Sequence, residues 1–169
     1  MMMRASISVV GQNRARSPLV CMNSLKKGDK MPGFQLKNQN GRNVNVKPGG
    51  KAKVIFFYPK DDSPGCTREA KAFNDAYGQL KKYADVYGIS SDSPESHKNF
   101  CDSLNLSYTL LADEDGSVRK QFGVKSDLFG ILPGRETFVI AKNGTVLEVF
   151  NSQLSPEKHV EVASKALGV

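Results

Sequence analysis

The sequence predicts an α/β fold, a three-layer sandwich in which helices cover both faces of a central sheet. Short segments rich in β-branched and aromatic residues alternate with segments whose apolar residues recur at helical spacing. The chain ends in two strand segments around Asn143-Gly144 and a last helical segment, which indicates a closing hairpin packed by a helix. The length of 169 residues fits one domain of this kind, with a leader before it.

The first predicted elements are strands. Phe34–Leu36 and Val44–Val46 are short strand candidates joined through a turn that contains Asn40-Gly41. Val54–Tyr58 is continuously apolar and rich in β-forming residues, which predicts a strand buried on both faces. Pro59 ends this strand.

Helices and strands then alternate. A long helix is predicted from Thr67 to about Tyr83, with one apolar stripe made of Ala70, Phe73, Tyr77 and Leu80. Ser93 and Pro94 form an N-cap and first-turn pair, which opens a helix that runs to about Leu104. The other predicted elements are strands at Val86–Ser90, Tyr108–Leu111, Thr137–Ile140 and Val146–Phe150, a short helix at Val118–Phe122, and a last helix that starts at Ser155-Pro156.

Composition excludes several functional classes. Five of the 24 basic residues and none of the 17 acidic ones lie in residues 1–28, so the rest of the chain is close to neutral despite the net charge of +7. A near-neutral body without a basic stripe predicts no nucleic-acid partner. The longest apolar run is five residues, too short for a membrane span. Among the three cysteines there is no CxxC pair, which argues against zinc ribbons and ordinary dithiol oxidoreductases.

Residues 1–24 are predicted to be a transit peptide or a disordered leader, and residues 25–169 to be the folded domain. The leader contains arginines and serines but no carboxylate, a composition typical of plastid and mitochondrial transit peptides. The alternative is a disordered tail that carries no targeting signal. Cys21 lies inside this leader, so we expect no catalytic role for it.

Cys66 is the residue most indicative of chemistry. It follows a buried strand after one turn and lies at the start of a predicted helix, where free backbone N–H groups and the helix dipole favour a thiolate. Ser63, three residues earlier, is expected to bring its hydroxyl back to the sulfur. The alternative is an inert buried cysteine that packs as a small apolar residue. The Pro-Gly before Cys66 and the Thr-Arg-Glu after it are typical of a surface, which favours reactivity.

The run YPKDDSPGCT resembles the peroxidatic loop of peroxiredoxins, whose pattern is Pro-x-x-x-Thr/Ser-x-x-Cys. Pro59, Ser63 and Cys66 occupy its three fixed positions. The stretches GDKMPGFQL, YGISSDSPESHKNF, YTLLADEDGSVRKQFGV, DLFGILPGRETFVIAKNG and SPEKHV are similar to the peroxiredoxin Q branch, also called bacterioferritin comigratory proteins. The resemblance covers about Leu25 to Leu167 and is nearest to plant and algal plastid forms. It implies a thioredoxin-like fold and a plastid location, with the mitochondrion as second choice.

The resemblance also implies a reaction. The Cys66 thiolate would attack H2O2 or an alkyl hydroperoxide and become a sulfenic acid. Arg135, in the run GRETFVI, would stabilise the thiolate and orient the peroxide, with an ordinary surface ion pair as the alternative. The Ser63 hydroxyl would stabilise charge on the oxygens, and Pro59 would shield the sulfur. This chemistry needs no metal and no cofactor; a hydroperoxide and a thioredoxin or similar thiol reductant are the expected partners.

The sequence departs from the branch at the resolving cysteine. Many members carry it five residues after the peroxidatic one, and that position is Lys71 here. Cys101 lies 35 residues after Cys66, in the predicted Pro94–Leu104 helix, and matches an alternative position of some members. It is expected to form a disulfide with Cys66 after the helix start around Cys66 has opened. A packing thiol is the alternative, and a metal site with His97, four residues earlier, would lack further ligands.

Three functions are therefore compared. The first is a thioredoxin-dependent peroxidase, a monomer with in-chain resolution by Cys101. The second is a one-cysteine peroxidase that an external thiol reduces directly. The third is a redox sensor that passes oxidation from Cys66 to a partner without turnover.

Overall fold

The computed structural model describes residues 23–127 and 129–169. Within them, a seven-stranded mixed sheet has the order β2-β1-β5-β4-β3-β6-β7. The strands are β1 (Phe34–Asn38), β2 (Asn43–Val46), β3 (Ala52–Phe57), β4 (Ala84–Ser90), β5 (Thr109–Ala112), β6 (Glu136–Ile140) and β7 (Val146–Asn151). The helices are α1 (Pro64–Leu80), α2 (Pro94–Leu104), α3 (Ser117–Phe122) and α4 (Lys158–Leu167).

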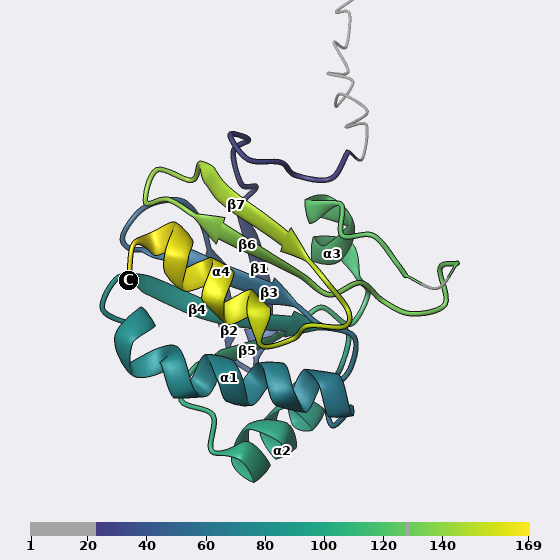
Figure 1. Ribbon diagram of the computed structural model, residues 1–169. Helices are drawn as coiled ribbons and strands as arrows, with labels where there is room; N and C mark the ends of the chain where they lie inside the picture. Colours follow the sequence, from purple (N-terminus) through teal and green to yellow (C-terminus); the bar gives the residue numbers. More distant parts are fainter. Residues whose placement is uncertain (1–22, 128) are drawn as a thin grey trace, which may run out of the picture.

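The helices form two layers around the sheet, as predicted (Figure 1). One core cluster packs α1, α2 and α4 against one face of the sheet. The other packs α3, Leu25 and Met31 against the opposite face. The central strand β3 pairs in parallel with β4 and antiparallel with β6. This three-layer arrangement is the α/β sandwich that the sequence predicts.

Strand β3 is buried on both faces along its whole length, as its continuous apolar run predicted. Alternate residues serve different cores: Phe56 stacks on Phe73 of α1 with ring centroids 4.2 Å apart, whereas Phe57 packs edge-on against Phe138 in the opposite core. The strand ends at Phe57, and Tyr58 still donates its N–H to Ile89. The loop that follows β3 therefore starts from a fixed position in the core.

The predicted elements are all present, and the differences concern their ends. Helix α1 spans Pro64–Leu80 instead of Thr67 to Tyr83, because Ser63 is extended at the N-cap and Pro64 fits the first helical position. Helix α4 starts at Lys158 because the residues from Ser155 onward first form tight turns, in which the Lys158 N–H bonds to the Ser155 carbonyl. Helix α2 has the predicted bounds, and the side chain of Ser93 accepts from the Ser96 N–H at 3.2 Å.

The leader prediction cannot be compared with the fold, because residues 1–22, including Cys21, lie outside the described residues. Ser24 already contacts the folded domain, because its hydroxyl donates to the Gly123 carbonyl at 2.6 Å. The boundary at residues 24 and 25 stays a prediction. In the described ranges, none of the helices has the length and apolar character needed to cross a membrane.

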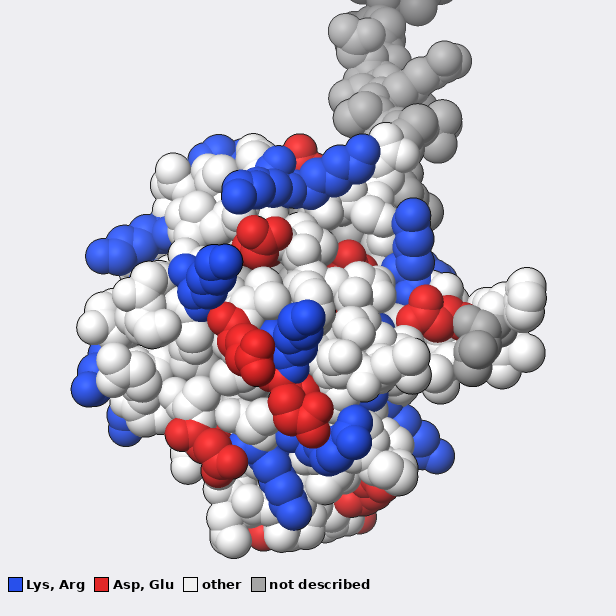
Figure 2. All heavy atoms as spheres, viewed as in Figure 1, with Lys and Arg blue, Asp and Glu red and all other residues white. Residues whose placement is uncertain are grey.

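Charges of both signs are interspersed over the face of the molecule in Figure 2. Lys and Arg side chains lie next to Asp and Glu side chains over much of this view, without a broad surface of one sign. This distribution fits the near-neutral body that composition predicts. It gives no support on this face to an electrostatic nucleic-acid surface.

Candidate active site

Cys66 lies in the first turn of α1, two residues after Pro64. The Thr67 N–H bonds back to the Ser63 carbonyl at 2.8 Å, so the helix begins immediately before the cysteine. The side chain is only 1% exposed and belongs to the core cluster under α1. The helix start was predicted, but the burial was not, because the flanking residues are typical of a surface.

Arg135 is the partner of the buried sulfur. Its Nη2 donates to Cys66 Sγ at 3.3 Å, and its Nη1 donates to Glu69 Oε2. Arg135 is 3% exposed, so it is not a surface ion pair. Burial opposes its charge, but Glu69 and Cys66 raise the pKa of Arg135 above its ordinary value. A Cβ on Gly65 would lie 3.0 Å from Nη2, and the glycine thus leaves room for the guanidinium beside the helix start.

Glu69 forms the other side of this arrangement and was not predicted from the sequence. Burial raises its pKa to about 8, against the opposing effect of Arg135. Among the described residues, Oε1 has no hydrogen-bond partner and lies 3.7 Å from His159 Nδ1. A carboxyl group held largely neutral near pH 7 leaves the Arg135 charge available to Cys66. The only signal in the sequence is its position, one helical turn after Cys66.

His159 lines the same buried region as a neutral ring. Its Nε2 donates to the Ser152 carbonyl at 2.9 Å, so its Nδ1 accepts from the Thr137 hydroxyl at 2.8 Å. Burial lowers the pKa of His159 to about 4. A neutral imidazole adds no second positive charge next to Arg135.

The pH dependence of folding gives a test of the buried carboxyl group. In a Cys66→Ser background, we expect stability to fall as pH rises from 5 to 8. The unfolded chain releases the Glu69 proton near its ordinary pKa of 4.5, whereas the folded chain holds it up to about 8. Above pH 8 both states are ionised and this contribution becomes constant.

Adding Glu69→Gln to that background should reduce this fall and leave the part due to Glu136, whose pKa burial raises to about 7. The measurement is urea unfolding of both variants at intervals from pH 5 to pH 9. Equal pH slopes in the two variants would contradict the raised pKa of Glu69.

Arg119 joins the two loops at the site and was also missed from the sequence. Its Nη1 donates to the Gly134 carbonyl at 2.7 Å and its Nη2 to the Tyr58 carbonyl at 2.9 Å. It thereby ties the end of β3 to the residue before Arg135. A Cβ on Gly134 would clash with the Lys125 carbonyl, which explains the glycine at this position.

Ser63 differs from expectation. Its hydroxyl donates to the Lys60 carbonyl at 3.0 Å, within the loop, and makes no cap bond to the helix. The predicted contact with the Cys66 sulfur is therefore not made in this structure. The reason is local: the Lys60 carbonyl lies in a tight turn and takes the hydroxyl as its donor.

Pro59, Ser63 and Arg135 line one hollow of about 750 Å³. Pro59 is buried, and its shielding of the Cys66 sulfur stays a prediction. The other lining residues are Lys60, Asp127, Leu132, Asn151, Gln153 and Leu154. The hollow gives a route from solvent to the guanidinium that contacts Cys66.

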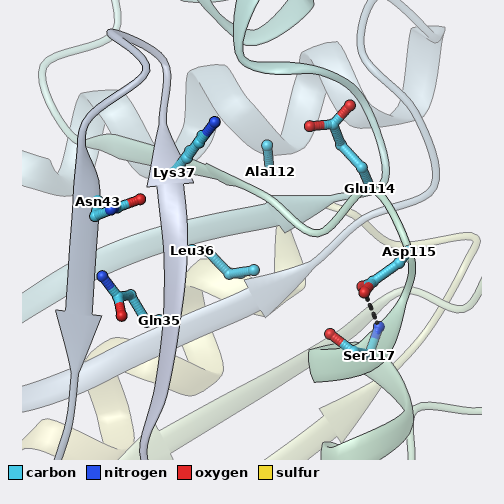
Figure 3. Close-up of a pocket in the computed structure, with 8 residues that line it drawn as sticks. All are labelled: Gln35, Leu36, Lys37, Asn43, Ala112, Glu114, Asp115 and Ser117. Atoms are coloured by element: carbon cyan, nitrogen blue, oxygen red, sulfur yellow. Dashed lines mark hydrogen bonds between the residues drawn. The ribbon is translucent and has the colours of Figure 1, made fainter.

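A second hollow, drawn in Figure 3, lies between β1, β2 and the loop that follows β5. Its lining includes Lys37, Asn43 and Glu114, and Asp115 accepts from the Ser117 N–H at 2.9 Å. It shares no residue with the hollow at Arg135. Within the described part of the chain, neither hollow is lined by a cysteine, but the first includes Arg135, whose Nη2 contacts Cys66 Sγ. The Arg135 hollow is therefore the candidate site.

Cys101 lies on α2, and its thiol is 6% exposed in the same core cluster as Cys66. Burial, reinforced by Asp61 and Asp102, raises the pKa of Cys101 to about 12. Both cysteines are free thiols in this structure. The folded arrangement therefore holds Cys101 as a protonated thiol.

His97 does not form a metal pair with Cys101. Its Nε2 donates to the Leu111 carbonyl at 3.1 Å, and its Nδ1 lies 2.8 Å from Asp61 Oδ2. A metal ion could in principle be held by a group whose ligand atoms lie within 4.8 Å of one another, namely Asp61, Asp92 and His97. Their ligand atoms are already engaged by hydrogen bonds, which does not favour a cation there.

Comparison with known proteins identifies the family. Residues 27–149 match the model of the AhpC/TSA family. A chloroplastic peroxiredoxin Q from Sedum lineare is 54% identical over 143 residues, which are 83% of this chain and 77% of that protein. The chain belongs to the peroxiredoxin Q branch of the AhpC/TSA family.

Further relatives agree. A chloroplastic peroxiredoxin Q from Arabidopsis thaliana is 50% identical over 145 residues, 85% of this chain and 67% of that protein. The peroxidoxin BcpB of Mycobacterium tuberculosis superposes with a TM-score of 0.76 at 36% identity and covers 85% of this peroxiredoxin and 97% of its own chain. The bacterioferritin comigratory protein of Xanthomonas campestris was solved to study its alkyl peroxide reduction. It superposes with a TM-score of 0.72 at 28% identity, and the match covers 80% of this chain and 90% of that protein.

Proposed function

We propose that this peroxiredoxin is a thiol peroxidase in which Cys66 reduces H2O2 and alkyl hydroperoxides. The observation that carries the proposal is the 3.3 Å contact between Arg135 Nη2 and the buried Cys66 Sγ at a helix start. A guanidinium and helix N–H groups both lower the energy of a thiolate. The thiolate is the nucleophile that the reaction needs.

In the proposed reaction the Cys66 thiolate attacks one oxygen of the peroxide. An S–O bond forms as the O–O bond breaks, Cys66 becomes a sulfenic acid, and the alkoxide or hydroxide leaves as alcohol or water after taking a proton. Arg135 stabilises the negative charge that moves from sulfur to the oxygens. Pro59 shields the sulfur, and Ser63 acts on the peroxide oxygens only if its hydroxyl turns away from Lys60.

The hollow at Arg135 supports an organic substrate as well as H2O2. Leu132, Leu154 and Pro59 give it apolar walls, while Arg135 supplies the charge at its inner end. Alkyl peroxide reduction is the activity for which the Xanthomonas campestris relative was studied. We therefore include small alkyl hydroperoxides among the substrates.

We further propose that Cys101 resolves the sulfenic acid within the chain and that a thioredoxin-type dithiol reduces the disulfide. The resolving step consumes the Cys101 thiol and the Cys66 sulfenic acid and releases water as the S–S bond forms. Because both thiols are buried in separate helices, part of α1 or α2 must open first. The chloroplastic names of the relatives support a plastid location and give no support to the mitochondrion. In-chain resolution supports a monomer.

Peptide mapping after one equivalent of H2O2 distinguishes the three candidate functions. For the peroxidase with in-chain resolution we expect a Cys66–Cys101 disulfide, and turnover with thioredoxin that Cys101→Ser reduces at least about tenfold. Cys101→Ser should still form the Cys66 sulfenic acid in the first turnover.

Other outcomes favour the alternatives. Normal turnover of Cys101→Ser with an external thiol would make this a one-cysteine peroxidase. Rapid oxidation of Cys66 with no turnover under any thiol reductant would make it a redox sensor. An unoxidised Cys66 would contradict the proposed function itself.

A further inference from the structure

A buried carboxylate in the Cys66 loop collects three side-chain donors. Asp61 Oδ1 accepts from the Tyr58 hydroxyl at 2.6 Å, and Oδ2 accepts from Ser96 Oγ at 2.7 Å and His97 Nδ1 at 2.8 Å. Asp61 is 4% exposed and His97 is fully buried. We call these four residues the Asp61 cluster. No step of the proposed reaction uses it so far.

The cluster contains a buried carboxylate–imidazole pair, with Asp61 Oδ2 2.8 Å from His97 Nδ1. Both ring nitrogens of His97 face oxygen acceptors, the Asp61 carboxylate and the Leu111 carbonyl, so both are placed to donate a hydrogen bond. Burial tends to raise the pKa of Asp61, but the hydrogen bond and charge of His97, with the Tyr58 and Ser96 hydroxyls, hold it below its ordinary value. Asp61 is therefore charged at neutral pH, with both oxygens fully engaged.

The cluster links the two cysteine-bearing segments. Asp61 lies five residues before Cys66 in the loop between β3 and α1, whereas Ser96 and His97 lie one to two turns before Cys101 on α2. Asp92 adds a further tie from the segment before α2, because its Oδ2 accepts the Asp61 N–H at 2.9 Å. If the loop and α2 move apart, Asp61 must separate from Ser96 and His97.

We propose that Asp61 is a positioning residue that holds the Cys66 loop against α2 and thereby sets how often the two segments separate for disulfide formation. The proposal rests on the proposed function, since it assigns a control point to the resolving step. A disulfide requires Cα atoms within about 7 Å and aligned Cβ vectors, which two buried thiols on separate helices reach only after opening. Intact, the cluster favours the closed site, in which Arg135 contacts Cys66.

The electrostatics act in the same direction. The Asp61 charge is one of the causes that raise the pKa of Cys101, after burial itself. Opening exposes the thiol and moves it away from this carboxylate, so Cys101 becomes a better nucleophile when the cluster is broken. The closed arrangement therefore favours oxidation of Cys66, and the open arrangement favours disulfide formation with Cys101.

Asp61→Asn tests the proposal because an amide cannot receive all three donors. The amide side chain has one oxygen that accepts and one NH2 group that donates. The NH2 group would face either the Tyr58 hydroxyl or the Ser96 and His97 donors, and the negative charge beside His97 is lost. Asp62→Asn is the matched control: it removes the same charge from the neighbouring exposed residue, and asparagine tolerates the positive φ of 61° found there.

The first measurement is hydrogen exchange of the reduced protein, which needs no peroxide. We expect amides in residues 59–67 and 94–104 to exchange at least about tenfold faster in Asp61→Asn, with β3 and β6 unchanged and Asp62→Asn like the wild type. Ser96→Ala removes one donor and no charge, so its exchange rates should lie between those of the wild type and Asp61→Asn. Unchanged exchange in Asp61→Asn, or a uniform increase over the whole chain, would overturn the proposal.

The second measurement is the fate of Cys66 at high H2O2, where disulfide formation competes with further oxidation to sulfinic acid. Asp61→Asn should raise the ratio of disulfide to sulfinic acid several-fold while slowing the first oxidation of Cys66. A residue that only stabilises the fold would lower the melting temperature and leave this ratio unchanged. If the wild type forms Cys66 sulfenic acid but no disulfide with Cys101, this proposal fails and the peroxidase function stands; if Cys66 is not oxidised, the peroxidase function fails.

Discussion

Cys66→Ser is expected to reduce peroxide consumption to the level of the uncatalysed reaction. The serine hydroxyl fits the site of the thiol, but it is not deprotonated beside Arg135 near neutral pH and is a far weaker nucleophile toward the O–O bond. The fold should be retained, because the change replaces one small buried side chain by another in the first turn of α1. The measurement is the loss of H2O2 in a thioredoxin-coupled assay.

Cys21→Ser is the control for this experiment. Cys21 belongs to the predicted leader, so its replacement should leave peroxide consumption unchanged. Activity that survives in Cys66→Ser and disappears in Cys21→Ser would move the peroxidatic role out of the folded domain. Activity that survives in both would show that neither cysteine is the nucleophile.

Local sequence patterns were enough to predict most of the fold. The buried strand β3 followed from its continuous apolar run, and helix α2 followed from the Ser93-Pro94 start with exact bounds. The predicted start of α1, at Thr67, is three residues late, because proline fits the first position of a helix and the helix begins at Pro64. Such boundaries depend on backbone conformation at one or two residues.

The site was less predictable because it is assembled from distant segments. Cys66 could be singled out from its neighbours alone, but the position of Arg135 beside it came only from the family resemblance. Glu69 and Asp61 are charged residues in polar stretches, where exposure is the usual outcome. Their burial depends on partners 66 and 36 residues away, Arg135 and His97, which no local pattern reveals.

The direction of the Ser63 hydroxyl shows the same limit on a smaller scale. Its position three residues before Cys66 is compatible with a bond to the sulfur and with a bond back into the loop. The choice depends on which acceptor the turn leaves open, and that acceptor is the Lys60 carbonyl. A rotation about one side-chain bond separates the two arrangements, so spacing alone could not decide between them.

Arg135→Ala is expected to slow the oxidation of Cys66 about 100-fold or more, the usual cost of losing one donor that stabilises developing charge. The loss combines two effects: the thiolate loses the cation 3.3 Å from its sulfur, and the leaving oxygen loses its positive partner. Arg135→Lys should recover part of the rate, because it keeps the charge but cannot donate to Cys66 and Glu69 at once from a planar group. Stopped-flow measurement of Cys66 oxidation over a range of H2O2 concentrations follows this step directly.

Two arguments separate this loss from a loss of folding. Removing Arg135 leaves Glu69 buried without its cation, but the pKa of Glu69 is already raised to about 8, so the carboxyl group stays protonated near pH 7 and no unpaired buried charge results. Arg68→Ala provides the matched control, since Arg68 lies on the same helix but is exposed and pairs with Glu157 at 3.2 Å. If Arg135→Ala and Arg68→Ala both stay folded and oxidise at the wild-type rate, the Cys66 thiolate owes its reactivity to the helix start alone. Arg135 is then a structural residue that hydrogen-bonds the buried Glu69 carboxyl group.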